Sequence, residues 1–126
     1  MDYRRFFLPL LTAVFIIVAA PCLALEGPLM KGKSLALLCN SSKQDDQFSC
    51  QSYIGGIIDY HNLIKSLGAA PSVDFCIPPQ ATMSHITQAV TRYLIGHSEH
   101  QDFIAAPGVA MALYNAYPCA RKKSRR

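Results

Sequence analysis

The cysteines are the most reactive side chains of this sequence, and four of them follow a long apolar N-terminal segment: Cys39, Cys50, Cys76 and Cys119. No two of these have the gap of about two to four residues that structural zinc sites use. An even number of cysteines in an exported chain, as argued below, favours disulfide bonds over metal binding or thiol catalysis. Three pairings are possible. We favour Cys39–Cys50 with Cys76–Cys119, because each bond then joins the ends of elements expected to be neighbours.

The histidines are the next candidates for chemistry. His97 and His100 have the spacing of two metal ligands on one helical turn, but Gly96 and the polar residues around them predict a solvated loop, so we expect no metal there. His61 lies among regularly spaced apolar residues. We expect it to be partly buried and hydrogen-bonded rather than a general base.

No catalytic motif is present. The sequence contains no Gly-x-Ser-x-Gly elbow, no phosphate-binding glycine loop and no zinc-protease helix motif. A Cys–His nucleophile is disfavoured because each cysteine after the apolar segment has a plausible disulfide partner. Asp59, alone in a predicted helix, is expected to be structural. We therefore expect no catalytic site and no cofactor, and we rank a hydrolase lowest.

The first 24 residues are typical of a secretory signal peptide. Arg4 and Arg5 precede an uncharged run over 6–20, and small residues precede a cut after Ala24. The apolar run is also just long enough to act as an uncleaved membrane anchor, which is the alternative. With cleavage, the protein is expected outside the cytoplasm, without stable membrane association.

The positive net charge of +4 is concentrated at the C-terminus. Five of the twelve basic residues lie in the tail 121–126, whereas residues 25–120 contain five basic and seven acidic residues. A nucleic-acid-binding protein carries its positive charge across a folded face, so we expect no nucleic-acid partner. The tail is expected to be solvated, with contact to anionic lipid or wall polymer as the alternative.

The segment 25–120 is predicted to be one all-α domain, a compact four-helix-type bundle tied by two disulfides. Hydrophobic residues make up 51% of the chain, which argues against disorder. The first predicted helix has its N-cap at Ser34 and ends at Cys39, and the second runs from Phe48 to Leu67. The third has its N-cap at Thr82 and ends at Gly96, and the last has Pro107 in its first turn and stops at Pro118. The second helix should bury its apolar stripe, and the last should bury Val109, Ala112, Leu113, Ala116 and Tyr117.

Two adjacent glycines, Gly55 and Gly56, interrupt the long helix. Each costs about 1 kcal/mol of helix stability relative to alanine. Such a cost suggests the close approach of another helix backbone, or a local bend.

Four ordered sequence pieces resemble a known family. They are Leu35-x-x-Leu38-Cys39, the run from Cys50 to Asp59, Cys76-Ile-Pro-Pro followed by Thr82, and Arg92-Tyr-Leu leading to Ala116-Tyr-Pro-Cys119. Together with the export signal, this combination is similar to the Rap/Tai family of immunity proteins. Members of that family protect bacteria against peptidoglycan amidases delivered by type VI secretion.

The resemblance implies a periplasmic helical protein, often a homodimer, with two disulfides at positions that the four cysteines match. It also implies a mechanism, in which the protein binds a cognate amidase toxin and a protruding element fills its cleft. For that element we nominate the segment 96–103, whose candidate contact residues are His97, Glu99, His100, Asp102 and Phe103. The basic tail and Gly56 depart from what the family leads us to expect.

A second hypothesis is a small periplasmic helical chaperone or stress protein that exposes apolar surface in acid. Few ionisable groups besides His61 lie on the predicted core stripes, which counts against a broad acid switch. Inhibitory binding of an amidase is therefore the favoured function.

Overall fold

The computed structural model describes residues 29–120, and the predicted signal peptide and basic tail lie outside this range. The described residues form four α-helices and one 3-10 turn: α2 (Gly32–Cys39), α3 (Gln44–Ser66), α4 (Met83–Gly96), η2 (Ser98–His100) and α5 (Ala105–Ala116). Within this range the all-α prediction is confirmed. None of these helices combines the length and the apolar character needed to cross a membrane.

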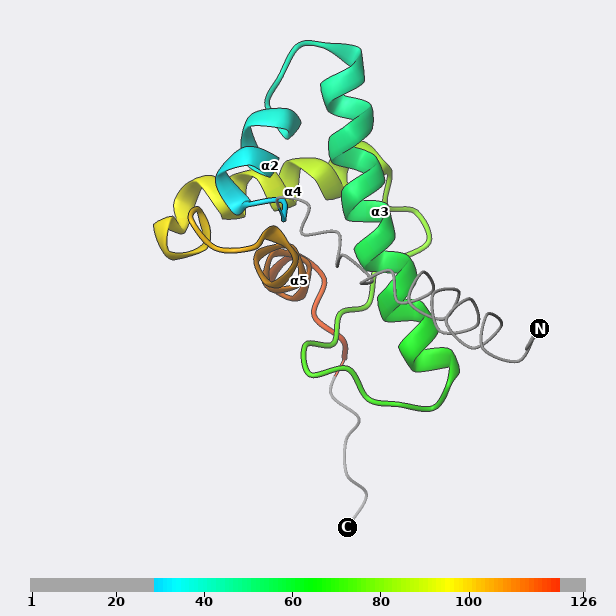
Figure 1. Ribbon diagram of the computed structural model, residues 1–126. Coiled ribbons are helices and arrows are strands. Elements are labelled where there is room, and N and C mark those ends of the chain that lie inside the picture. Colours follow the sequence, from blue (N-terminus) through cyan, green and yellow to red (C-terminus); the bar gives the residue numbers. More distant parts are fainter. Residues whose placement is uncertain (1–28, 121–126) are drawn as a thin grey trace, which may run out of the picture.

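The helices cross one another rather than running side by side (Figure 1). The long helix α3 stands upright, α4 passes across the back, and α5 is seen along its axis between them. Helix α4 packs against both α2 and α5. The largest fully buried side chains come from all four helices: Leu35, Cys50, Ile54, Val90, Leu94, Val109 and Leu113. The core therefore lies where the four helices meet.

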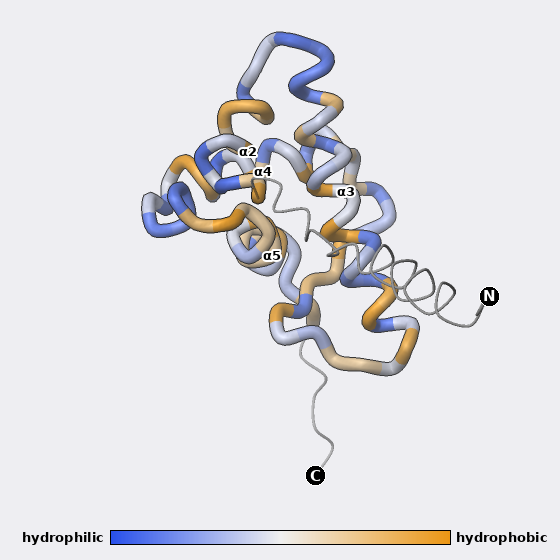
Figure 2. Tube along the Cα trace, viewed as in Figure 1, coloured by the Kyte–Doolittle hydropathy of each residue, from blue (hydrophilic) through white to orange (hydrophobic). Residues whose placement is uncertain are grey.

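Apolar residues also reach the surface. Figure 2 shows them at the lower end of α3 and in the segment that follows it. On α3, Tyr60, Leu63 and Leu67 are between half and three-quarters exposed, and their spacing places them on one helix face. This face extends beyond the four-helix core.

Both predicted disulfides are confirmed. Cys39–Cys50 joins the end of α2 to α3, and Cys76–Cys119 joins the loop after α3 to the segment after α5. In the chain-entropy model, loops of 11 and 43 residues correspond to about 3 and about 4 kcal/mol. A domain of this size buries a modest core, so these bonds contribute much of its stability.

The predicted N-cap at Thr82 is confirmed, because its hydroxyl accepts a hydrogen bond from the backbone N–H of His85. Two other predicted helix starts are wrong. Helix α2 begins at Gly32 after Lys31, not at a Ser34 cap, because backbone carbonyls from another segment accept from its first N–H groups. Helix α3 begins at Gln44, four residues before the predicted start at Phe48.

The early start of α3 has a local cause in the polar residues that precede Phe48. The Ser41 hydroxyl donates to Asp46 at 2.6 Å and accepts from the backbone N–H of Lys43, while the Gln47 side chain donates to the Ser41 carbonyl. Asp45 and Asp46 lie in the first turn, where the helix dipole favours negative charge. Polar residues before Phe48 therefore form the first turn of the helix. In α5, Ala116 is exposed, so that part of the predicted buried face is also wrong.

The predicted close approach at Gly55 and Gly56 is wrong. A Cβ at Gly56 would meet nothing within 4 Å, and one at Gly55 would only touch the methyl of Met83. The glycines with no room for a side chain are instead Gly32 and Gly108. A Cβ at Gly32 would overlap the carbonyl of His100, and a Cβ at Gly108 would lie 2.8 Å from a Leu94 methyl. Both lie beside the segment between α4 and α5.

Gly108→Ala should therefore destabilise the protein by about 1–3 kcal/mol, because the new methyl overlaps a fully buried leucine. The matched control is Gly56→Ala, which places the same methyl in open space within a helix and should stabilise by about 1 kcal/mol. Urea unfolding followed by circular dichroism measures both. Equal and small effects of the two substitutions would contradict the packing described here.

Candidate functional site

The segment between α4 and α5 is held by backbone hydrogen bonds to the start of α2. The carbonyl of Phe103 accepts from the N–H of Gly32 at 3.0 Å, and the carbonyl of Gln101 accepts from the N–H of Lys33 at 2.8 Å. The first N–H groups of any helix lack partners within the helix and need acceptors from outside. Since Lys31 offers no side-chain cap, this segment supplies those acceptors.

The same segment is fastened to the end of α4. The side-chain amide of Gln101 donates to the carbonyls of Leu94 and Ile95, each at 3.4 Å. The His97 ring donates through Nδ1 to the carbonyl of Tyr93 at 2.8 Å and stacks on the Tyr93 ring, with centroids 3.9 Å apart. The connection is therefore braced from two helices.

Tyr93 links both candidate histidines. Its hydroxyl lies 3.3 Å from Nε2 of His100. Burial, and secondarily the negative charge of Glu99, raise the pKa of Tyr93 above its ordinary value. The hydroxyl therefore stays protonated at neutral pH and can donate to His100. His97 and His100 are half-buried supports of the loop, in contrast to the solvated pair that we expected.

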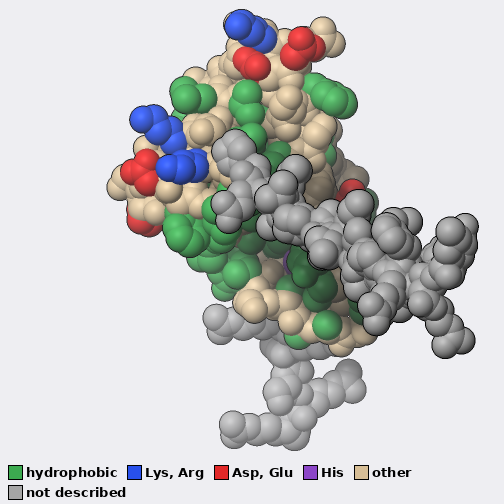
Figure 3. Space-filling model, viewed as in Figure 1, with side chains coloured by type: hydrophobic (Ala, Val, Ile, Leu, Met, Phe, Trp, Pro, Cys, Tyr) green, Lys and Arg blue, Asp and Glu red, His purple; other side chains and the backbone are tan. Residues whose placement is uncertain are grey.

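Three of the five nominated residues face solvent. Glu99 and Asp102 are exposed, and Phe103 exposes 59% of its surface although its backbone is hydrogen-bonded to α2. Figure 3 shows basic and acidic side chains side by side at the edge formed by α2 and η2, with apolar side chains below them. The structure thus brings an aromatic ring and two carboxylates together on one fixed turn.

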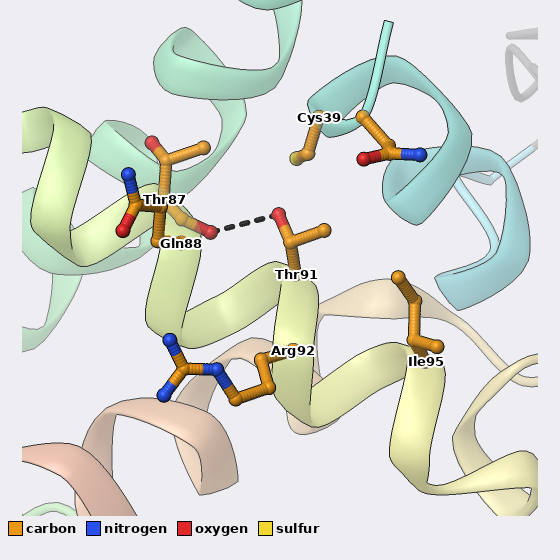
Figure 4. A pocket seen from close by; sticks show the side chains of 7 residues that line it. Cys39, Thr87, Gln88, Thr91, Arg92 and Ile95 are labelled. Atoms are coloured by element: carbon orange, nitrogen blue, oxygen red, sulfur yellow. Dashed lines mark hydrogen bonds between the residues drawn. The ribbon is translucent and has the colours of Figure 1, made fainter.

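A hollow of about 440 Å³ lies beside this turn and was missed by the sequence analysis. It is lined by the end of α2 and one face of α4: Cys39, Asn40, Thr87, Gln88, Thr91, Arg92 and Ile95. Figure 4 shows Thr91 pointing into the space between the two helices, with its hydroxyl donating to the Thr87 carbonyl. The i, i+4 spacing on α4 was visible in the sequence, but the crossing of α2 that closes the hollow was not.

A second hollow, of about 380 Å³, lies at the opposite end of the molecule near His61. His61 is 6% exposed, stacks on Phe75 with centroids 3.8 Å apart, and donates through Nε2 to Asp74 at 3.1 Å. The prediction of a partly buried, hydrogen-bonded His61 is confirmed. Lys65 also donates to Asp74, at 2.8 Å. This group ties the loop after α3 to the helix.

Within residues 29–120, one set of side chains has metal-ligand atoms close together: Asp74, Cys76 and Cys119, all within 4.8 Å. The two cysteines are joined in a disulfide, so they do not offer the thiolates that zinc requires. Among residues 29–120, His97 and His100 belong to no such set of three, and Nδ1 of His97 is hydrogen-bonded to the Tyr93 carbonyl.

A family model for Rap1a immunity proteins matches residues 31–119. The matched range begins at the residue before α2, includes the braced turn and all four disulfide cysteines, and ends at Cys119. Comparisons with curated proteins and with solved structures gave no match.

The ion pair at Asp74 predicts a defined pH dependence of stability. The hydrogen bond from Lys65, with its charge and that of His61, lowers the pKa of Asp74 below the ordinary value of 3.8. A carboxyl with a lowered folded-state pKa contributes stability above its unfolded pKa and loses it as the pH falls through the folded one. The melting temperature of the wild type should therefore exceed that of Asp74→Asn near neutral pH, and the difference should vanish in strong acid.

Thermal unfolding between about pH 2 and pH 7 measures this difference. In Lys65→Gln the loss of stability on acidification should begin at higher pH, because the partner that lowers the pKa of Asp74 is gone. If the difference in melting temperature between the wild type and Asp74→Asn stayed constant over the whole pH range, Asp74 would not be the titrating group.

Proposed function

Because the chain belongs to the Rap1a immunity protein family, we propose that it is a periplasmic immunity protein against a type VI secretion effector, a peptidoglycan amidase. It acts by binding the effector and occluding its active-site cleft, not by catalysis. The observation that carries this proposal is the braced turn between α4 and α5, which presents Phe103, Glu99 and Asp102 to solvent.

The turn has the properties of a preorganised binding element. Its backbone is hydrogen-bonded to α2, and the side chains of His97 and Gln101 are hydrogen-bonded to α4, so little conformational entropy is lost on association. An exposed aromatic side chain on a rigid support is the usual centre of an interface hot spot. Glu99 and Asp102 beside it favour a partner surface with cationic or hydrogen-bond donor groups. His97 and His100 act by holding the turn rather than by direct contact.

The hollow beside the turn extends the proposed interface. It connects to the turn through Ile95, whose carbonyl accepts from Gln101 and whose side chain is 57% exposed. A hollow of this kind accepts one partner side chain, with Asn40 and Arg92 available for hydrogen bonds. The proposed contact area therefore joins a protruding aromatic to a neighbouring recess.

The disulfides and the family support the proposed periplasmic compartment. Disulfide bonds persist in oxidising spaces such as the periplasm, and both form here. We propose that residues 1–24 are a cleaved signal peptide, that 25–120 is the immunity domain, and that the tail 121–126 is solvated. We also propose a homodimer, for which the exposed face of Tyr60, Leu63 and Leu67 is available, and no cofactor, nucleic-acid or membrane partner.

Phe103→Ala should weaken binding to the cognate amidase by about 2 kcal/mol, or roughly thirtyfold in Kd, because the hot-spot ring is lost. The matched control is Phe48→Ala, which removes a ring that is somewhat more exposed (72% against 59%) from the first part of α3. Calorimetry with a catalytically inactive form of the cognate amidase, sought first among the genes beside this one, measures both. Protection of cells that express the active amidase in the periplasm should follow the same order.

Equal weakening by both substitutions would contradict the assignment of the turn as the contact element. Failure of the wild type to bind, or to protect, would contradict the immunity function itself.

A further inference from the structure

The two disulfides have different surroundings. Cys50 is fully buried in the core, and Cys39 is half-buried beside it. Cys76 is exposed, and Cys119 is half-buried at the end of the described chain. A reductant in solution can reach a disulfide only where its sulfurs are accessible, and accessible disulfides are the labile ones. The bond at 76–119 thus joins an exposed residue to a half-buried one, whereas the core bond joins a half-buried residue to a fully buried one.

Charged groups surround the accessible bond. The ammonium of Lys65 lies 3.9 Å from the sulfur of Cys76 and 2.8 Å from a carboxylate oxygen of Asp74. Asp74 in turn accepts from His61, which approaches from the same helix as Lys65. A cation beside a cysteine favours its thiolate. No comparable cation contacts the sulfurs of Cys39 or Cys50 among the described residues.

From this geometry we propose that Cys76–Cys119 is a redox-sensitive site, which a dithiol reductant opens selectively in the folded protein, with Cys76 as the leaving thiolate. The proposal is independent of the amidase-binding function. It assigns to the chain a second kind of partner, a dithiol compound or a protein carrying a dithiol.

The reaction is a two-step thiol–disulfide exchange. One thiolate of the reductant attacks the sulfur of Cys119, a new S–S bond forms there, and the Cys76–Cys119 bond breaks. Cys76 leaves with the electron pair as a thiolate that the Lys65 ammonium stabilises. The second thiol of the reductant, after losing its proton, then attacks its own sulfur in the mixed disulfide and releases Cys119, which takes up a proton. The protein gains two electrons, and the dithiol is oxidised to a disulfide.

Opening this bond loosens one end of the molecule. The disulfide lies beside an isolated antiparallel bridge between Phe75 and Pro118 and a hydrogen bond from the N–H of Cys76 to the carbonyl of Tyr117 at 2.8 Å. Phe75 is 3% exposed and carries the stacked ring of His61. With the bond open, these contacts and the packing of Tyr117 against the core are left to hold the segment after α5. The braced turn lies on other elements and keeps its support.

Reduction also raises the question of whether a metal ion would replace the Lys65 ammonium. The thiolates of Cys76 and Cys119 with the carboxylate of Asp74 would offer three zinc ligands. Lys65 contacts two of these three groups, however, and its positive charge opposes a divalent cation at the same place. The geometry therefore favours a thiolate–ammonium pair over a metal site.

The experiment treats the mature protein with increasing dithiothreitol, quenches by alkylation, and maps labelled cysteines by mass spectrometry. We expect Cys76 and Cys119 to be labelled while Cys39 and Cys50 remain joined and the circular dichroism stays helical. Because opening occurs in the folded state, the rate should be insensitive to urea below the unfolding transition. Simultaneous labelling of all four cysteines, at a rate rising with urea, would show opening through global unfolding and overturn the proposal.

Lys65→Gln tests the role of the ammonium. It should slow reduction of the 76–119 bond by roughly threefold, because the leaving thiolate loses its stabilisation. Lys65→Arg should restore the rate, and Lys33→Gln, at an exposed lysine of α2, should leave it unchanged. An unchanged rate in Lys65→Gln would overturn the electrostatic part of the proposal.

Two further readouts test the chemistry. A trapped mixed disulfide, formed with a monothiol such as glutathione, should lie on Cys119, and an adduct on Cys76 would overturn the assigned leaving group. Zinc added to the reduced protein should not bind at micromolar concentration. Tight zinc binding that required both cysteines and Asp74 would replace the thiolate–ammonium pair by a metal site.

Discussion

The N-terminus of α2 needs acceptors for its first N–H groups, and this requirement shapes the surface of the protein. Carbonyl groups of Gln101 and Phe103 meet it, and they can approach only because residue 32 is glycine. A backbone that caps a helix cannot move without leaving buried donors unpaired, which is costly. The connection between α4 and α5 is therefore as fixed as the helices it joins. Its side chains are free to face solvent because its backbone carries the structural role.

The opposite end of the molecule is held by side chains and a covalent bond. His61, Lys65 and Asp74 fasten the loop after α3, and Cys76–Cys119 joins this loop to the end of the chain. An exposed ion pair contributes little to stability, whereas the disulfide acts mainly by restricting the unfolded chain. The two ends thus respond differently to conditions. Reductants act on the end with the disulfide and acid acts on the Asp74 ion pair beside it, whereas the braced turn is held by backbone hydrogen bonds to α2 and by the side chains of His97, His100 and Gln101.

Much of the fold could be predicted from the sequence, because local signals and tertiary packing agree along most of it. The Thr82 cap, the apolar stripe through Ile54 and the pairing of the cysteines all follow from residue type and spacing. The predictions that failed depended on contacts from distant segments. The start of α2 at Gly32 was not predicted because the partners of Gly32 lie about 70 residues later in the chain. Gly55 and Gly56 were predicted to lie close to another helix because their cost in helix propensity is visible in the sequence and their surroundings are not.

At the candidate site, too, contacts between distant segments could not be predicted from the sequence, and there they matter for function. Composition could nominate the segment 96–103 as polar with one aromatic residue, but it could not separate residues that support the turn from residues that face a partner. The contacts of Tyr93 make this distinction. Its ring stacks on His97 and its hydroxyl lies near His100, so both histidine rings are half-buried supports of the turn. What remains exposed is Phe103 with Glu99 and Asp102, on a turn that directly follows Ile95, a residue lining the recess between α2 and α4. An inhibitor that works by occlusion needs such an arrangement, because an element entering another protein's cleft must keep its shape where it has no support of its own core. Bracing from two helices gives the turn that rigidity, and under the proposed function it leaves the contact face unobstructed.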